Sequence, residues 1–254
     1  MTYAAAFSIV ILSAVVVTAA SLCVDRTISL EARRRHHDVG NQVFQLIGVM
    51  FSVILAFVLS EVWSEYNTAK QAIGGECGAL HGAAMLANAL PNHEGRPINE
   101  SIFAYAQKVV QTEWPLMAKE RRSLGAVDDL RAAFDTAARL RATTSSEVAN
   151  RSQIISLLTQ AHAHREMRTF QLQLGMPQAM WAVLITIGLI LVAFVVLSGT
   201  ELPATILFGT TFAISIAMVL VLVRMLDYPF EGALALGNDD FVKLIGELQG
   251  LLGR

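Results

Sequence analysis

Charged residues are scarce in this sequence and absent from four long stretches. Only 16% of the residues are Asp, Glu, Lys or Arg, against about 25% in typical soluble domains. No charged side chain occurs in residues 1–24, 39–60, 169–200 or 202–223. A soluble core helix seldom stays uncharged for so long, because one of its faces meets water, whereas about 20 apolar residues cross a bilayer. The sequence therefore predicts an all-α membrane protein with four transmembrane helices.

Cysteine is also rare, and its two positions exclude two kinds of site. Cys23 and Cys77 lie far apart, so they predict neither a disulfide framework nor a metal-binding spacing. The first apolar block has no Lys or Arg before it, as a secretory signal would need, so we expect a retained span. The net charge of −2 argues against a nucleic-acid partner.

Motifs that carry enzymatic chemistry are missing. The sequence contains no nucleophile elbow, P-loop, dinucleotide fingerprint or HExxH pattern. His162 and His164 are two residues apart on a predicted helix, so their side chains point about 200° from each other and cannot share a metal ion. His36 and His37 stand in a short connector without evident further ligands. We expect a protein that is not an enzyme and needs no cofactor.

The apolar blocks divide the chain into four parts. Residues 1–60 hold the first two spans, and residues 61–177 form a helical extramembrane domain. Residues 178–223 hold the third and fourth spans, and residues 224–254 form an amphipathic tail. The even number of spans places both termini and the domain on the same side of the membrane.

The second span is expected to continue as the first helix of the domain, with Gly74 and Gly75 as a soft point and its end at Pro91. Three- and four-residue steps predict one buried stripe, made of Val62, Tyr66, Ala69, Ile73, Cys77, Leu80, Ala84 and Ala87.

Three more helices are predicted in the domain. Asn99 is expected to cap the first, which Pro115 would kink because proline removes a helical hydrogen bond. The second covers about Val127–Ala142. Thr144 and Glu147 form the pattern of a capping box, which predicts a long helix from there to Phe170.

The spans contain no Asp, Glu, His, Lys or Arg, which argues against an ion-coupled transporter. A passive pore needs no such charges, because apolar constrictions can gate by dewetting. Val49, Val53 and Phe57 on the second span are spaced by four and share one face. In a ring of subunits they would form three stacked apolar collars. Alternatively, the same residues face lipid or a neighbouring helix.

Several short segments resemble the bacterial bestrophin-like family of unknown function, in order from about residue 33 to 245. They are His37-Asp38, Val53-Ile54-Leu55-Ala56-Phe57, Trp63, Tyr66, Tyr105, Glu113-Trp114-Pro115, Pro177, Trp181 and Asp227-Tyr228-Pro229-Phe230-Glu231-Gly232.

A more distant resemblance is to the bestrophins, pentameric anion channels whose second span carries an apolar neck. It implies neck positions at Val49, Val53 and Phe57. The acidic run that clasps calcium in bestrophins is similar to the stretch around Asp239 and Asp240, which would be a cation-contacting cluster. Two aspartates alone supply too few oxygens for a calcium site of six to eight ligands.

The side of the membrane on which the domain lies has two opposed indications. The connector between the first two spans holds four arginines, so the positive-inside rule places it in the cytoplasm and the domain outside. The bestrophin resemblance implies a cytoplasmic domain instead.

Together these features predict a homo-oligomeric, pentameric ion channel of the bacterial inner membrane, with anions such as chloride favoured. Its expected partners are further copies of itself, the lipid bilayer and small inorganic ions. The alternative is a membrane-anchored scaffold or sensor without a conducting pore.

Overall fold

The computed structural model describes residues 1–34, 37–119, 121, 125–172 and 175–253, without the side chains of residues 37–39 and 92. The described residues form helices, turns and loops, and no strand. Arg35, His36 and the side chains of His37 and Asp38, all singled out in the sequence, lie outside the described residues. The chain forms two compact units, residues 1–64 with 176–227 and residues 65–175 with 228–254.

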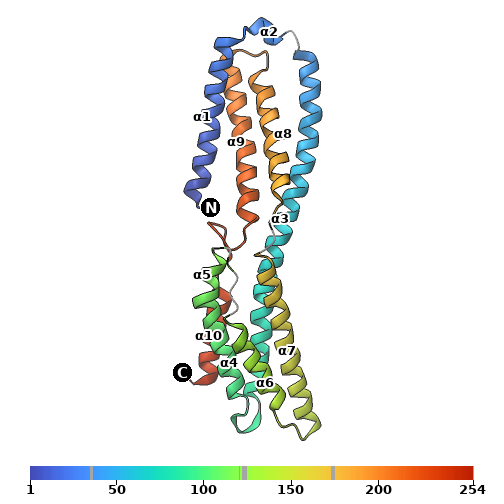
Figure 1. The fold of residues 1–254 in the computed structure, drawn as a ribbon, viewed down its shortest axis with the longest axis vertical. Coiled ribbons are helices and arrows are strands. Elements are labelled where there is room, and N and C mark those ends of the chain that lie inside the picture. Colours follow the sequence, from blue (N-terminus) through green and yellow to red (C-terminus); the bar gives the residue numbers. More distant parts are fainter. Residues whose placement is uncertain (35–36, 120, 122–124, 173–174, 254) are drawn as a thin grey trace. The chain divides into compact units, whose positions relative to one another are not determined.

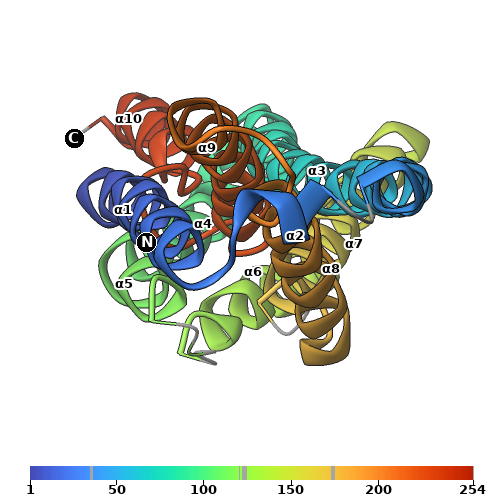
Figure 2. The ribbon, with the colours of Figure 1, turned by 90° about the horizontal axis from the view of Figure 1, so that it is seen from above.

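The first unit contains four helices that are long and apolar enough to cross a membrane. They are α1 (Tyr3–Thr27), the first part of α3 (His37–Asn88), α8 (Gln178–Val196) and α9 (Leu202–Leu226). A short helix, α2 (Leu30–Arg34), lies between α1 and α3, at the end of the bundle seen from above in Figure 2. The four predicted spans are confirmed, and the chain is an integral membrane protein of all-α class.

Helices α1, α9 and α8 pack side by side in the first unit (Figure 1). Val17, Val196 and Ala213 form one buried cluster between them. Gly209 of α9 lets α1 approach closely, because a Cβ there would lie only 3.1 Å from Cγ1 of Val17, as small residues do in membrane helix pairs. Most other side chains of the spans point outward, where lipid or another chain can cover them.

The second unit holds the later part of α3 and the remaining helices. These are η1 (Pro91–His93), α4 (Arg96–Lys108), the π-helical turn η2 (Val109–Glu113), α5 (Trp114–Met117), α6 (Val127–Arg139), α7 (Ser145–Phe170) and α10 (Asp239–Leu252).

The core of the second unit is built on the stripe predicted along α3. Its members from Ala69 to Ala87 are buried, which confirms the predicted periodicity and its continuation past the second span. Side chains from other helices join this core, among them Ile98 and Ile102 of α4, Leu130 of α6, Ile154 and Leu158 of α7, and Phe241 and Leu248 of α10.

The capping box at the start of α7 is confirmed. Thr144 Oγ1 accepts a hydrogen bond of 3.2 Å from the Glu147 N–H, and Glu147 Oε2 accepts one of 3.2 Å from the Thr144 N–H. The preceding helix, α6, ends at Arg139 rather than near Ala142. Leu140 is extended there, and its carbonyl accepts a hydrogen bond of 3.2 Å from Arg151 Nη1.

Two local predictions around α4 need correction. Asn99 does not cap the helix, because α4 already begins at Arg96 and Asn99 is buried in its first turn. Pro97 fits that first turn, where an N–H would have no helical partner. The disturbance expected at Pro115 takes the form of the π-helical turn Val109–Glu113 shortly before it, a single turn of the kind in which π-helix mostly occurs within α-helices.

Candidate functional site

One face of α3 in the first unit presents apolar side chains away from the chain. The exposed fractions of Val49, Val53 and Phe57 are 66%, 50% and 73%. At 3.6 residues per turn these three positions lie within about 80° of one another around the helix. They form one continuous surface, which we call the α3 stripe.

The opposite face of α3 packs against other helices of the first unit. Phe51, Val58 and Val62 are buried, and helical geometry places them about 160° from the centre of the α3 stripe. Phe44, farther toward the start of α3, contacts the rings of Phe194 and Phe212, with centroid distances of 6.3 and 5.8 Å. The α3 stripe is therefore the face of this helix that the chain itself leaves uncovered.

The aspartates singled out as a cation-contacting cluster lie in the first turn of α10. Asp239 and Asp240 are both exposed, and negative charge at this end of a helix is favoured by the helix dipole. Among the described residues, no group of three or more His, Cys, Asp or Glu side chains gathers as a metal site would require.

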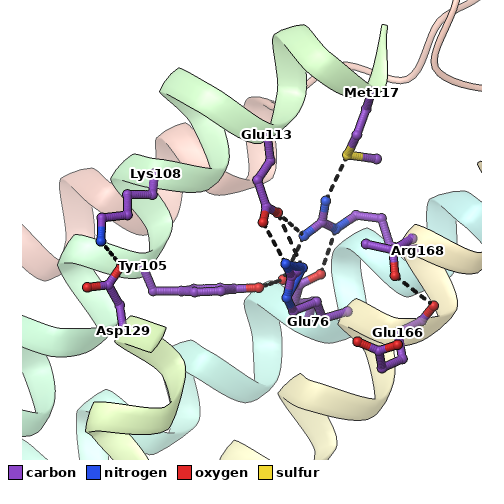
Figure 3. A network of polar contacts seen from close by, with 10 residues as sticks. Glu76, Tyr105, Lys108, Glu113, Met117, Asp129, Glu166 and Arg168 are labelled. Carbon is purple, nitrogen blue, oxygen red and sulfur yellow. Dashed lines mark hydrogen bonds and ion pairs between the residues drawn. The ribbon is translucent and has the colours of Figure 1, made fainter. Parts of the chain in front are cut away.

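A buried charge cluster lies at the centre of the second unit, where α3, α4, η2 and α7 meet (Figure 3). It consists of Glu76, Tyr105, Glu113, Arg165 and Arg168, whose exposed fractions are all 2% or less. Arg168 Nε donates a hydrogen bond of 2.8 Å to Glu76 Oε2, and its Nη2 reaches Glu76 Oε1 at 3.2 Å. The same Nη2 lies 3.3 Å from Glu113 Oε2, so Arg168 joins the two carboxylates.

The second arginine completes the charge balance of the cluster. Arg165 donates to both oxygens of Glu113, at 2.6 Å from Nη2 and 3.3 Å from Nη1. The Tyr105 hydroxyl donates to Glu76 Oε1. Two carboxylates thus face two guanidinium groups, and this pairing is what makes the burial of four charges tolerable.

Aromatic rings cover Arg168. Its Cζ lies 5.5 Å from the ring centroids of both Trp114 and Phe241, a distance at which rings attract a cation. Burial by itself would lower the pKa of Arg168, but the facing Glu76 carboxylate outweighs it and holds that pKa above its ordinary value. Burial, followed by the negative charge of Glu76, raises the pKa of Tyr105 well above its usual range.

The segment between α9 and α10 is tied to the same core. Tyr66 donates a hydrogen bond of 3.0 Å to the Leu234 carbonyl, and Trp114 Nε1 donates one of 3.3 Å to the Leu236 carbonyl. Trp114 also meets Phe230 edge-on, with the ring centroids 6.0 Å apart. Several residues that carried the family resemblance are therefore anchors of the second unit.

Sequence reasoning missed most of the charge cluster. Glu113 was noticed only within a motif, and Arg165 and Arg168 were not singled out. A signal was present: Glu76 lies on the apolar stripe of α3, and both arginines continue the Ile154, Leu158 and Ala161 face of α7 at helical spacing. A charge on an apolar face indicates a buried partner elsewhere.

The chain is similar in sequence and in fold to known proteins. A family model of the Bestrophin-like domain matches residues 11–241. Crystal structures of a bacterial bestrophin homolog from Klebsiella pneumoniae superpose well on the fold. A single-substitution form has a TM-score of 0.77 at 14% identity and covers 96% of this chain and 99% of its own. A form phased on zinc has a TM-score of 0.76 at 15% identity and covers 96% and 98%.

A comparison with curated proteins found no match. The match of the family model extends over most of the chain, from inside α1 to the first turn of α10. The protein therefore belongs to the Bestrophin-like family.

Proposed function

We propose that this protein is a homo-oligomeric, pentameric anion channel of the bacterial cell membrane, with chloride as a conducted ion. The observation that carries the proposal is the α3 stripe. Val49, Val53 and Phe57 are apolar, contiguous and left open by their own chain, while the opposite face of α3 is buried. Membership of the Bestrophin-like family supports the same function.

The stripe fits a neck made of several subunits. One chain contributes four spans, too few to surround an axial pathway, so each subunit of a ring would place its α3 at the axis. The three positions then become three collars of side chains. Such a constriction passes ions when it is wetted and blocks them when it dries. The cation-contacting role of Asp239 and Asp240 stays a prediction.

Ion flux from liposomes tests the channel. The purified full chain is reconstituted, and chloride efflux is measured against a gluconate control. Val53→Ala and Phe57→Ala shorten neck side chains, so we expect each to raise the efflux several-fold. Phe7→Ala is the matched control, because Phe7 on α1 has an exposed fraction of 68%, close to the 73% of Phe57. Equal effects of Phe7→Ala and Phe57→Ala would argue that the stripe only meets lipid.

Subunit number is measured separately by native mass spectrometry. A pentamer that passes chloride supports the proposal. A monomer contradicts it, because one chain cannot close the collars. An oligomer without flux in which neck substitutions change nothing favours the alternative, a membrane-anchored scaffold or sensor.

Labelling of a single thiol determines the side of the membrane on which the second unit lies. Cys77 does not serve, because it is buried in the second unit. Ser152 of α7 is exposed, so Ser152→Cys in a chain with both native cysteines replaced by serine offers an accessible thiol. Reaction with a membrane-impermeant reagent on intact cells places the second unit outside, and reaction only after lysis places it in the cytoplasm.

A further inference from the structure

A cavity of about 420 Å³ opens in the first unit where the spans end. Its wall comes from α2, the start of α3, the end of α8, the loop after it and α9. Because these are the ends of membrane-spanning helices, the cavity lies at the level of the lipid head groups. Its volume is in the range of roughly 300–1,000 Å³ typical of sites for organic ligands, more than one small inorganic anion needs.

Arg33 lines this cavity and has buried hydrogen-bond donors without a partner among the described residues. Its side chain is only 3% exposed, and its Nη2 donates a hydrogen bond of 2.8 Å to Asp25. Nε and Nη1 of Arg33 are buried and have no hydrogen-bond partner among the described residues. Buried donors of an arginine are costly when they bond to nothing, so a ligand that supplies an acceptor to Nε and Nη1 would stabilise the site.

The loop opposite Arg33 is held in place and carries hydroxyl groups. Arg34 Nε donates a hydrogen bond of 3.0 Å to the Gly199 carbonyl. Gly199 permits this approach, since a Cβ there would lie 2.7 Å from Cγ of Arg34. Ser198 Oγ lies 3.0 Å from Thr200 Oγ1, and either atom can donate. When Thr200 donates, the Ser198 proton is available to a ligand in the cavity.

Asn41 adds one more polar side chain, and the rest of the lining is apolar. The rings of Phe44, Phe194 and Phe208 form much of the wall, with Val195 and Leu197. A site with two unpaired N–H donors of a guanidinium group, hydroxyls and apolar walls suits a molecule that has an anionic head and a hydrocarbon part. At a membrane surface such basic pockets between helices bind anionic lipid head groups.

We propose that this cavity binds the phosphodiester head group of an anionic phospholipid, with Arg33 contacting the phosphate and the phenylalanine rings lining the path of the acyl chains. This inference concerns the first unit alone and does not rest on ion conduction.

Lipid binding to the delipidated full chain tests the site, with native mass spectrometry as the readout. The probes are phosphatidylglycerol, phosphatidylcholine and inorganic phosphate. We expect wild type to bind phosphatidylglycerol at least tenfold more tightly than phosphatidylcholine. Arg33→Gln should abolish that preference, and Arg33→Lys should restore part of it. Arg26→Gln is the matched control, because Arg26 is exposed at the end of α1 and does not line the cavity.

A second pair of variants changes the space rather than the charge. Gly40 lines the cavity, and a Cβ at Gly40 meets nothing within 4 Å, so Gly40→Leu should fill it and weaken phosphatidylglycerol binding at least tenfold. Gly48 on the same helix is equally open and lies outside the cavity, so Gly48→Leu should leave binding unchanged.

Three results would overturn the proposal. The first is equal loss of binding in Arg33→Gln and Arg26→Gln, which would indicate a diffuse surface charge. The second is unchanged phosphatidylglycerol binding in Gly40→Leu. The third is displacement of phosphatidylglycerol by millimolar inorganic phosphate, which would make the cavity a site for a free anion.

Discussion

Arg168 Nε lies 2.8 Å from Glu76 Oε2 in the second unit, and neither side chain has any exposed surface. The two residues are 92 positions apart in the sequence. Their pairing fixes α7 against α3 at one register, because a shift of either helix would leave a charge buried without its partner.

Loss of one partner in this pair should destabilise the protein strongly. Arg168→Met leaves the Glu76 carboxylate without its bidentate partner, and we expect a loss of about 3–5 kcal/mol in the free energy of unfolding. Glu76→Leu should cost a similar amount. The double variant should cost much less than the sum, because an apolar pair can replace a buried ion pair.

Thermal unfolding in detergent of wild type, the two single variants and the double variant measures these losses and the coupling between the two side chains. Arg96 and Glu100 form an exposed pair at 3.2 Å and provide the control, where the same treatment should change little. Additive losses at Glu76 and Arg168 would show that the two side chains contribute independently.

Tyr105 should titrate only at strongly alkaline pH. Burial and the Glu76 charge raise its pKa, so the neutral phenol is favoured by the folded state. Its stabilising contribution is fully present below the ordinary tyrosine pKa of about 10 and is lost as the pH rises toward the raised value.

Ultraviolet absorbance of the phenolate, followed from about pH 8 to pH 13, measures this titration. The chain has four tyrosines, and one of them should ionise late, together with unfolding. Tyr105→Phe removes that late component. A curve for Tyr105→Phe that keeps it would assign the late titration to another tyrosine.

The capping box of α7 should be sensitive to acid. Backbone and hydroxyl hydrogen bonds from Thr143 and Thr144 lower the pKa of Glu147, so its contribution to stability is present above the ordinary glutamate pKa and disappears as the pH falls below it. Glu147→Gln should therefore melt below wild type at neutral pH and approach it in acid.

Thr144 offers a second measurement at the same cap. Thr144→Ala removes the acceptor of the Glu147 N–H and should cost about 1 kcal/mol, with no convergence toward wild type in acid. A constant gap between Glu147→Gln and wild type at all pH values would contradict the assigned role of the carboxylate.

Two glycines of the second unit should respond in opposite ways to alanine. A Cβ at Gly95 would lie 1.8 Å from the Ala87 carbonyl oxygen, so Gly95→Ala must displace backbone and should cost at least about 1–3 kcal/mol. A Cβ at Gly74 in α3 meets nothing within 4 Å, so Gly74→Ala should stabilise by roughly 0.5–1 kcal/mol. Melting temperatures measure both, and a loss in Gly74→Ala would point to another chain packed there.

Sequence patterns predicted the elements well where the signal is local. The charge-free blocks located all four spans, and Thr144 with Glu147 marked the start of α7. Asn99 was wrong as a cap because Pro97, two residues earlier, already belongs to the first turn of α4. A proline that fits a first turn competes with any cap residue after it.

The charge cluster shows what local patterns omit. Spacing along α7 places Arg165 and Arg168 on one face. It does not indicate that Arg168 pairs with Glu76, 92 residues earlier, or that Arg165 pairs with Glu113, 52 residues earlier. The α3 stripe is the reverse case. Its positions were readable from the sequence, and the structure adds that the chain leaves them uncovered.

The long separation between Glu76 and Arg168 also has a consequence for biosynthesis. At roughly 5–20 residues per second, a ribosome needs at least about 5 s to reach Arg168 after it has made Glu76. During that interval Glu76 is an unpaired carboxylate on the helix that carries the second span. An unpaired charge is costly within hydrocarbon, so we expect Glu76, like Glu61, Glu65 and Lys70 before it, to disfavour entry of the later part of α3 into the bilayer until its arginine is made.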